Sequence, residues 1–390
     1  MKICVLKELK KDENRVSLLP KHVSVLVENN HTVLIEKNAG LNSGYTDQDY
    51  INSGAIILSK EEVLQQAELI LKVKAPLKSE FNDYKEGQVL FTYLHFDENI
   101  IKEDILEFIK TKFLGIAYEW VGDKNNYPLL RPMSKITGYL FAQKSIELLS
   151  KYKGKLAGAY EIEHKSAEAL IIGLGTIGTS ALKYFLSNNL KVTIVDKNPD
   201  TLNDRVNKRF KTDNIDYLSK VNVIKFDMSS PYKVKEEISK IINKLDIVLN
   251  CAVRRSDLSK SNLDYIIDNN MIKMMEKGSV VCDTTGCDKD LIESCVSSSE
   301  LEYVDFIEGV VHYNCDHIPS AVANTSSQLL TEKTFPYILE LANEGIEKTL
   351  KTNKFLNNGV SCYKGYITHL YSADKKNMLE NYKSINELLN

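Results

Sequence analysis

The chain of 390 residues has no apolar run approaching the roughly 18 residues of a membrane-spanning helix. Its first stretch, MKICVLKELKKDENR, lacks an apolar core of signal-peptide length. Charge is nearly balanced as well, because 50 Lys and Arg stand against 53 Asp and Glu, for a net charge of −3. Neither nucleic acid nor a membrane is therefore expected as a partner. We expect a cytoplasmic protein of two domains, since a domain commonly takes about 100–200 residues.

Cysteine is scarce, and its seven copies form no CxxC pair. An odd number spread over a long chain argues against a disulfide framework, and the lack of paired spacing argues against zinc. No metal is therefore expected. Cys4, Cys251 and Cys282 lie in apolar runs, which predicts small buried hydrophobic side chains.

Short apolar runs alternate with amphipathic segments from the start of the chain. This alternation is typical of βα units and of a mainly parallel sheet that is buried on both faces. A long amphipathic segment, 136–155, then predicts a connecting helix. The strands expected before it are 2–7, 31–35, 69–73, 89–95 and 114–118, and the helices are 21–29, 60–67 and 102–111.

The same pattern restarts after this helix. We expect a polar loop at 312–327 and a helix at 335–350 near the end of the chain. The fold class is therefore α/β, with two Rossmann-like domains whose sheets are mainly parallel, the second inserted into a discontinuous first. The strands expected in the second domain are 169–172, 191–195, 221–226, 246–252 and 279–282, and the helices are 233–245 and 264–276.

A glycine-rich motif, Gly173-Leu174-Gly175-Thr176-Ile177-Gly178, lies between an expected strand and an expected helix. This context is typical of a dinucleotide-binding turn. Gly173 permits the tight turn, Gly175 lets the backbone approach a pyrophosphate, and Gly178 permits close packing of helix on strand. Thr176 and Ile177 open the helix and are expected to contact the cofactor.

Asp196 ends the next expected strand, eighteen residues after the last glycine of the motif. A carboxylate there can accept hydrogen bonds from the ribose hydroxyls and repels a 2′-phosphate, which favours NAD over NADP. Lys197 beside it weakens that discrimination slightly. The alternative is an ordinary aspartate at a strand end.

Three residues of the N-terminal part are candidates for binding a substrate. They are Arg15 in DENRVSLLP, Lys74 in LILKVKAP and His95 in LFTYLHF. Lys74 and His95 each end an expected strand, where open α/β sheets place ligand-binding groups. The alternatives are a surface arginine, a solvated lysine and a buried histidine without a catalytic role.

These segments together resemble the alanine dehydrogenase family, which includes the related N-terminal half of nicotinamide nucleotide transhydrogenase. The resemblance runs from residue 1 to about 346 in the same order and spacing. The stretches that carry it are MKICVLKELKKDENRVSLLP, LILKVKAPLKSEF, LFTYLHF, GIAYEWV, YPLLRPMSKITG, ALIIGLGTIGTSA, GVVHYNCDHIPSAV and TFPYILELANEGI.

The resemblance implies NAD-dependent, reversible oxidative deamination of a small L-amino acid to a 2-oxo acid. Arg15 and Lys74 would hold the substrate carboxylate and polarise the carbonyl or imine. His95 would be the general acid and base. Met133 would approach the substrate and Ser134 the cofactor. The resemblance also implies a homo-oligomer, either a hexamer or a dimer.

The implied domains are a substrate domain in two parts, 1–137 and 305–390, and an NAD-binding domain at 138–304. Two segments depart from the family pattern. The catalytic aspartate of the family can be matched only to Asp288, with one residue inserted. His317 stands where the family has an asparagine that can bind the cofactor, and Ser320 stands where it has a glycine.

Arg254 and Arg255 are a third departure, because the family continues there with apolar residues. Two arginines near the cofactor could bind a second carboxylate. An alternative function is therefore an opine- or saccharopine-type reductase, which joins an amino acid to a 2-oxo acid using NAD(P)H. The DHIPS stretch is similar to saccharopine-type and carboxyethyl-ornithine-type relatives. A non-catalytic NAD-binding protein is a further alternative.

Overall fold

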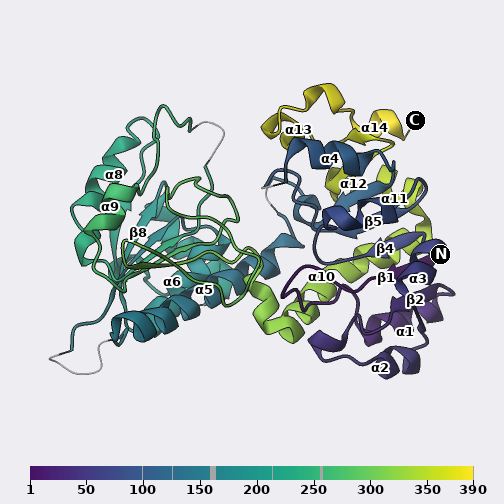
Figure 1. Ribbon diagram of the computed structural model, residues 1–390, viewed down its shortest axis with the longest axis horizontal. Coiled ribbons are helices and arrows are strands. Elements are labelled where there is room, and N and C mark those ends of the chain that lie inside the picture. Colours follow the sequence, from purple (N-terminus) through teal and green to yellow (C-terminus); the bar gives the residue numbers. More distant parts are fainter. Residues whose placement is uncertain (99, 125, 159–163, 213, 255–257, 390) are drawn as a thin grey trace. The chain divides into compact units, whose positions relative to one another are not determined.

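The computed structural model describes residues 1–98, 100–124, 126–158, 164–212, 214–254 and 258–389. The packing of the chain divides it into two units (Figure 1). Unit 1 comprises Met1–Met133 and Pro319–Asn390, and unit 2 comprises Ser134–Ile318, inserted between them. None of the described helices combines the length and the apolar character needed to cross a membrane.

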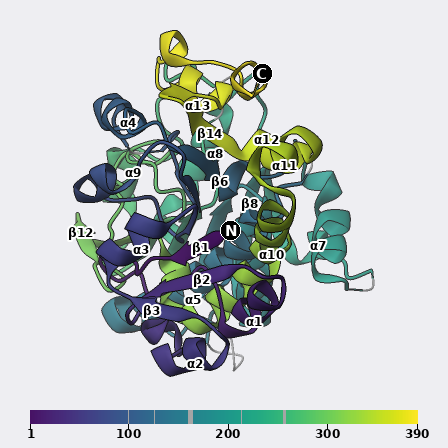
Figure 2. The same cartoon turned by 90° about the vertical axis from the view of Figure 1, so that its right-hand side faces the viewer.

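Unit 1 contains an eight-stranded sheet in the order β15-β14-β6-β5-β4-β1-β2-β3. Figure 2 labels five of its strands, which are β1, β2, β3, β6 and β14. The strands from β6 to β3 are parallel to one another, and β14 and β15 extend the sheet in antiparallel fashion. The order reverses between β1 and β4, and ligands of such sheets bind outside the carboxyl ends at that point. The strands are β1 (Lys2–Val5), β2 (Thr32–Glu36), β3 (Ile56–Leu58), β4 (Leu69–Leu71), β5 (Val89–Thr92), β6 (Leu114–Ala117), β14 (Val360–Tyr363) and β15 (Tyr366–Ile367).

Helices cover this sheet because their apolar stripes match it. In α3, Val63 is fully buried, and in α4, Ile105 and Phe108 are buried in the same cluster. Ser59 and Glu62 form a capping box that starts α3. The helices are α1 (Pro20–Glu28), α2 (Asp47–Asn52), α3 (Lys60–Gln66), α4 (Lys102–Ile109), α10 (Ala323–Glu344), α11 (Ile346–Thr352), α12 (Lys354–Gly359), α13 (Leu370–Lys375) and α14 (Ile385–Leu388).

Unit 2 contains a seven-stranded sheet in the order β12-β13-β11-β10-β7-β8-β9. All neighbours are parallel except β12 and β13. Apart from β12, the order is that of a dinucleotide-binding sheet, which reverses between β7 and β10. The strands are β7 (Glu168–Ile172), β8 (Lys191–Asp196), β9 (Val221–Lys225), β10 (Ile247–Asn250), β11 (Val280–Asp283), β12 (Asp305–Ile307) and β13 (Val310–Tyr313).

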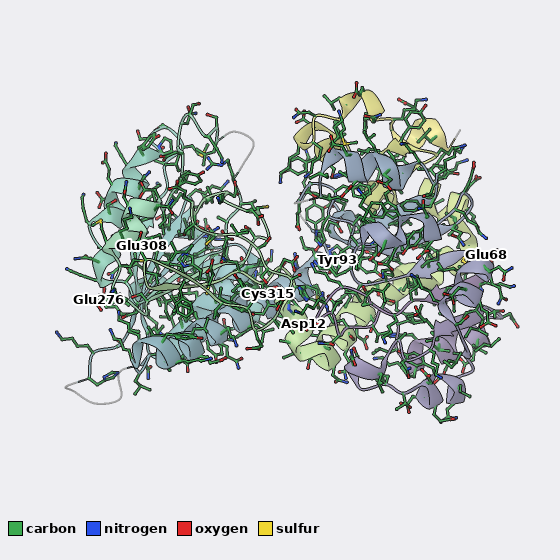
Figure 3. All side chains as sticks on the ribbon, in the orientation of Figure 1. Asp12, Glu68, Tyr93, Glu276, Glu308 and Cys315 are labelled. Atoms are coloured by element: carbon green, nitrogen blue, oxygen red, sulfur yellow. The ribbon has the colours of Figure 1, made fainter. Side chains whose placement is uncertain are left out.

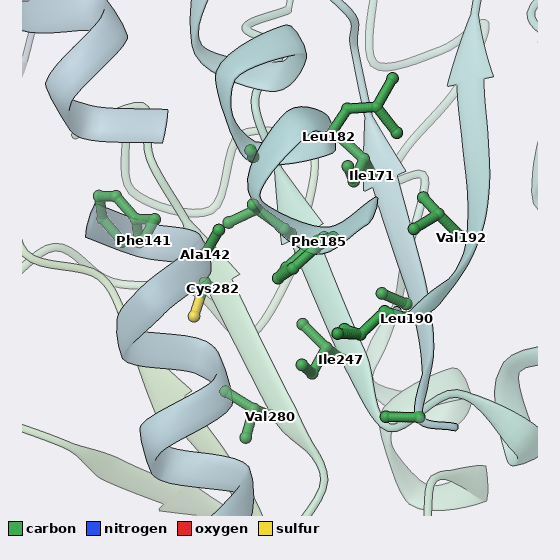
Figure 4. Packing of buried hydrophobic residues seen from close by; sticks show 14 of the residues in the cluster. Phe141, Ala142, Ile171, Leu182, Phe185, Leu190, Val192, Ile247, Val280 and Cys282 are labelled. Atoms are coloured by element: carbon green, nitrogen blue, oxygen red, sulfur yellow. The ribbon is translucent and has the colours of Figure 1, made fainter. Parts of the chain in front are cut away.

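Successive side chains of a strand point to opposite faces of the sheet. Both faces of this sheet are buried, each in its own hydrophobic cluster. Ile171 of β7 packs in a cluster with Phe185 and Phe141 (Figure 4), whereas Leu170 and Ile172 pack in a second cluster. The helices are α5 (Leu130–Lys153), whose first turn belongs to unit 1, α6 (Thr176–Ser187), α7 (Leu202–Phe210), α8 (Tyr232–Ser239) and α9 (Asn269–Met274).

The predicted α/β class with two mainly parallel sheets is confirmed. The polar loop expected at 312–327 is wrong, because His312 and Tyr313 end β13 and α10 begins at Ala323. β12 and β13 form a hairpin whose two turn residues, Glu308 and Gly309, have φ of 54° and 81°. That conformation is typical of a two-residue hairpin turn. The chain therefore stays in unit 2 beyond residue 304 and returns to unit 1 at Pro319.

Candidate active site and dinucleotide-binding site

The substrate-binding candidates of unit 1 lie where the strands end. Arg15 follows β1, Lys74 follows β4 and His95 follows β5. Tyr93, which is labelled in Figure 3, stacks on His95 with ring centroids 5.4 Å apart. The parallel strands bring these segments to one edge of the sheet, at the reversal of strand order.

The loop that carries Arg15 is fastened to the start of α10 and to the turn that precedes it. Ser320 Oγ accepts a hydrogen bond from the Asn14 N–H at 2.7 Å and donates one to the Asp12 carbonyl at 2.6 Å. Ser327 Oγ accepts from the Val16 N–H at 2.9 Å. Ser320, which departs from the family pattern, thus holds the loop before Arg15, and Ser327 holds it after Arg15.

Arg15 is buried and forms a two-pronged ion pair with Glu13. Its Nε and Nη2 donate to the two carboxylate oxygens at 2.7 and 2.6 Å, and its Nη1 donates to Met133 Sδ at 3.3 Å. Burial lowers the pKa of Arg15, but the Glu13 carboxylate outweighs burial and raises it. Arginine has five N–H donors. One donor on each of Nη1 and Nη2 is therefore without a partner among the described residues.

A buried ion network lies beneath Lys74. Glu8 accepts the Val73 N–H at 2.6 Å and the Lys74 N–H at 3.4 Å, and its carboxylate lies 3.6 Å from Lys72 Nζ. Lys72 in turn donates to Glu80 at 3.2 Å. Burial lowers the pKa of Lys72, but Glu8 and Glu80 outweigh it and raise that pKa. The network fixes the backbone from which the Lys74 side chain projects.

The ammonium group of Lys74 has no hydrogen-bond or ion-pair partner among the described residues, although Lys74 is only 9% exposed. Its charge nevertheless acts on His95, whose pKa it lowers. The ammonium nitrogen itself is not fully buried, so an incoming anionic or carbonyl oxygen can reach it. Lys74 is therefore placed to bind a substrate oxygen.

His95 is held in a left-handed conformation, with φ of 51°. Such a conformation is uncommon outside glycine and persists only where neighbours enforce it. Here the Glu119 carboxylate accepts the His95 N–H at 2.6 Å, and Glu98 binds Nδ1 at 3.0 Å. Burial lowers the pKa of His95, yet Glu98 and Glu119 outweigh burial and raise it above 6.5. Nε2 has no hydrogen-bond partner among the described residues.

Several of these supporting residues escaped the sequence analysis. Each is a charged residue in a segment that follows a buried strand, and that position was the available signal. Glu8, Lys72 and Glu119 could not be paired with their partners, because those partners come from other strands and loops. The missed residues are Glu8, Glu13, Lys72, Glu98 and Glu119.

The glycine-rich loop of unit 2 has the expected geometry. Gly173 has φ of 86°, and a Cβ on it would lie 2.7 Å from the Ala252 side chain at the end of β10. A Cβ on Gly178 would lie 1.9 Å from the Gly173 carbonyl oxygen, whereas one on Gly175 would meet nothing within 4 Å. The loop thus packs tightly on both sides and leaves open space only at Gly175, where a phosphate can approach. Thr176 and Ile177 begin α6 behind it.

A cavity of about 300 Å³ adjoins this loop. Asp196, Lys197 and Arg205 supply its charged lining among the described residues, and the rest is mostly apolar. Asp196 lies 2.9 Å from Arg205 Nη2 in an ion pair that the sequence analysis did not anticipate. The open space at Gly175 and this mixed lining fit a dinucleotide: its pyrophosphate would lie at the loop and its adenosine in the cavity.

Two aspartates follow or end β11. Asp288 is exposed on the loop that follows β11. Its Oδ1 accepts hydrogen bonds from the Ser297 N–H at 2.8 Å and from the Ser297 hydroxyl at 2.7 Å. Its catalytic role stays a prediction. Asp283 is instead buried and 3.0 Å from Asn250 Nδ2. Burial raises the pKa of Asp283 to about 6, which marks it as a further candidate at the carboxyl edge of this sheet.

His317 is buried in unit 2, near its end. Its Nδ1 lies 2.6 Å from Asp316 Oδ1 and 3.8 Å from Cys315 Sγ, and its Nε2 is buried without a partner among the described residues. Cys315 is labelled in Figure 3. Ser134 lies in α5 and takes part in further contacts. The cofactor contacts predicted for His317 and Ser134 remain predictions.

Arg254 is fully engaged inside unit 2. Its Nε donates to Asp290, and its Nη1 and Nη2 donate to the carbonyls of Leu258, Leu263, Asp264 and Asp290. These contacts use all five N–H donors of the guanidinium. Arg254 therefore has a structural role and no donor left for a second carboxylate. Arg255 lies outside the described residues.

The fold and the two sites define an α/β oxidoreductase of the dinucleotide-binding class. The chain matches the family models "Alanine dehydrogenase/PNT, N-terminal domain" over residues 4–137 and "Alanine dehydrogenase/PNT, C-terminal domain" over residues 140–370. It is 37% identical to the alanine dehydrogenase of Methanococcus maripaludis, covering 95% of each chain. It is 35% identical to alanine dehydrogenase 2 of Staphylococcus aureus strain Mu50, covering 100% of each.

Solved structures agree with this result. An L-alanine dehydrogenase has a TM-score of 0.79 at 29% identity, covering 96% of this chain and 99% of that one. The transhydrogenase from Sinorhizobium meliloti, at 19% identity and a TM-score of 0.72, shares the fold. The chain belongs to the alanine dehydrogenase/PNT family, which confirms the resemblance found in the sequence.

Proposed function

We propose that this protein catalyses the reversible, NAD-dependent oxidative deamination of L-alanine to pyruvate and ammonia. The observation that carries the proposal is the ammonium of Lys74, which has no partner among the described residues and lies within electrostatic reach of His95. Relatives with the name alanine dehydrogenase over the full length support the choice of substrate. The same family supports a homo-oligomer, a hexamer or a dimer.

Arg15 would bind the carboxylate of the substrate, and Lys74 would bind its carbonyl or imine group. Arg15 has one open N–H on each terminal nitrogen, which suits a carboxylate held at two points. Glu13 and Met133 fix the plane of that guanidinium. Lys74 would polarise the carbonyl or imine through its ammonium group.

His95 would move the proton. Glu98 accepts the Nδ1 hydrogen, which leaves Nε2 as the basic atom of the neutral ring. Nε2 would take a proton from the substrate amine or from water during oxidation and return it during reduction. The bound nicotinamide supplies the hydride acceptor. NAD rather than NADP is proposed on the carboxylate of Asp196 at the end of β8.

The test is NADH oxidation with ammonia and a panel of 2-oxo acids, followed by the same panel with lysine or ornithine in place of ammonia. We expect turnover with pyruvate and ammonia to exceed every other combination. Turnover that requires an amino acid as the nitrogen source would contradict the proposal and point to the opine-type reaction. The occupied guanidinium of Arg254 favours ammonia.

The pH dependence of alanine oxidation should report His95. Oxidation needs the neutral imidazole, so kcat/KM is expected to rise with pH through an apparent pKa above 6.5. Glu98→Gln removes a negative charge that favours the protonated ring. The acidic limb of the profile should therefore move to lower pH in this variant.

The matched control is Glu103→Gln, an exposed glutamate in the first turn of α4. Its profile should coincide with that of the parent. An acidic limb that stays in place in Glu98→Gln would show that a group other than His95 controls the rate.

A further inference from the structure

The segment that carries His95 packs against the C-terminal part of the chain within unit 1. Met378, which follows α13 and is fully buried, lies in the same hydrophobic cluster as Leu94 and Phe96. These two residues are the immediate neighbours of His95 in the chain. The residues after α13 therefore support the segment after β5 from below.

Lys376, which directly follows α13, binds the backbone next to His95. Its Nζ donates to the Glu98 carbonyl and, at 2.6 Å, to the Ile100 carbonyl. Hydrogen bonds from a charged donor are stronger than those between neutral groups, and Lys376 is half-buried, which shields them in part from water. The Lys376 ammonium thus holds the backbone of a residue that lies 278 positions earlier in the chain.

Glu98 is the residue whose side chain binds the His95 ring. Its carboxylate lies 3.0 Å from Nδ1, and its N–H donates to the His95 carbonyl at 3.0 Å. The Glu98 side chain is 33% exposed. A partly exposed ion pair is weak unless its geometry is enforced, because holding a long side chain in one place costs conformational entropy. Fixing the Glu98 backbone through Lys376 lowers that cost.

The charges around the His95 ring show why this contact matters. Burial lowers the pKa of His95, but Glu98 and then Glu119 outweigh it, and Lys74 acts against them. Burial raises the pKa of the neighbouring Asp97 carboxyl, and the His95 charge lowers it again. Among these charged groups Glu98 acts most strongly on the ring, so its position has the largest influence on the protonation of His95.

We propose that Lys376 is a positioning residue of the proposed reaction, which holds Glu98 against Nδ1 of His95 and so fixes the orientation and tautomer of the imidazole. The inference rests on the proposed function, because it takes His95 as the group that moves the proton. It goes beyond that function by giving the residues after α13 a part in the acid and base chemistry.

The first experiment compares the pH profile of alanine oxidation in the parent and in Lys376→Met. Release of Glu98 from Nδ1 should move the acidic limb of kcat/KM to lower pH by about half a pH unit. It should also lower kcat about tenfold and change KM by less than about threefold, because the base is less well oriented. Loss of the Lys376 charge alone would move the limb to higher pH, since removing a cation raises the pKa of a histidine.

Three further variants act as controls. Lys364 is exposed and its Nζ donates to the Leu388 carbonyl at 2.8 Å, so Lys364→Met removes the same kind of bond elsewhere and should leave the profile unchanged. Lys376→Arg keeps the charge and the donors and should retain most of the parent profile, which would show that loss of folding does not explain Lys376→Met. In a Glu98→Gln background, Lys376→Met should move the limb no further.

A second readout does not depend on turnover. Diethyl pyrocarbonate acylates the neutral imidazole, and the His95 side chain is 22% exposed. Mass spectrometry of the His95 peptide after brief treatment at a series of pH values therefore follows the titration of this ring. The pH midpoint of its modification should be lower in Lys376→Met than in the parent.

The outcomes separate the two proposals. A midpoint and an acidic limb that stay in place or move to higher pH in Lys376→Met would overturn the role of Lys376, even if the parent deaminates alanine. A parent without turnover would contradict the proposed function, and a lowered midpoint of modification would then still support the positioning of the His95 ring by Lys376.

Discussion

Replacing Lys74 with methionine is expected to lower kcat/KM for L-alanine by about 10³-fold. The Lys74 ammonium follows β4 and has no partner among the described residues. Methionine has a similar length and no charge. The variant should lose the polarisation of the substrate oxygen. Its thermal stability should be close to that of the parent, because the ammonium has no hydrogen-bond or ion-pair partner among the described residues to lose. Steady-state kinetics and a thermal melt measure both quantities.

Lys78→Met is the matched control for this prediction. Lys78 is 61% exposed and pairs with Asp104 and Glu107, so the same change should leave kcat/KM within about twofold. NADH affinity should be equal in all three proteins, because the proposed dinucleotide site lies in unit 2 and Lys74 lies in unit 1. A Lys74→Met protein as active as the parent would remove Lys74 from the chemistry.

The sheets were largely predictable because buried parallel strands are short continuous apolar runs. β1, β4, β5 and β10 each lie within an expected range. The glycine-rich turn was predictable for a similar reason, since its glycines answer to local steric needs. The buried strands and the glycine-rich turn depend on residues adjacent in the chain, so they could be predicted from the sequence.

The β12–β13 hairpin was missed although its signal is local. Its turn, Glu308-Gly309, lies between short apolar stretches, and β12 has two exposed residues of three. An edge strand of that kind lacks the continuous apolar run that marked the others. The expected loop at 312–327 failed because β13 ends in His312 and Tyr313, whose polar atoms bond within unit 2.

Long-range ion pairs were beyond reach for a different reason. Glu8 and Lys72 lie on different strands, and Asp196 meets Arg205 only because α7 packs beside the glycine-rich loop. The sequence showed an aspartate at a strand end, whereas the structure shows that this aspartate is paired with Arg205. The sequence therefore did not show that Arg205 balances the charge of this aspartate.

Gly175→Val is expected to abolish measurable NADH binding without unfolding the protein. A Cβ on Gly175 meets nothing within 4 Å, and its φ of −73° suits any residue, so stability should change by less than about 1 kcal/mol. The added methyl groups would fill the space through which the pyrophosphate approaches the backbone. Affinity should fall at least about 100-fold, or about 2.7 kcal/mol.

Gly178→Val provides the contrast, because its Cβ would lie 1.9 Å from the Gly173 carbonyl oxygen. The loop and α6 must then move apart, at a cost of about 3 kcal/mol in the free energy of unfolding. NADH titration by fluorescence and thermal melts of both variants distinguish a lost binding surface from a lost fold. If Gly175→Val kept the NADH affinity of the parent, the pyrophosphate would have to bind elsewhere, and the glycine-rich loop would be only a packing turn.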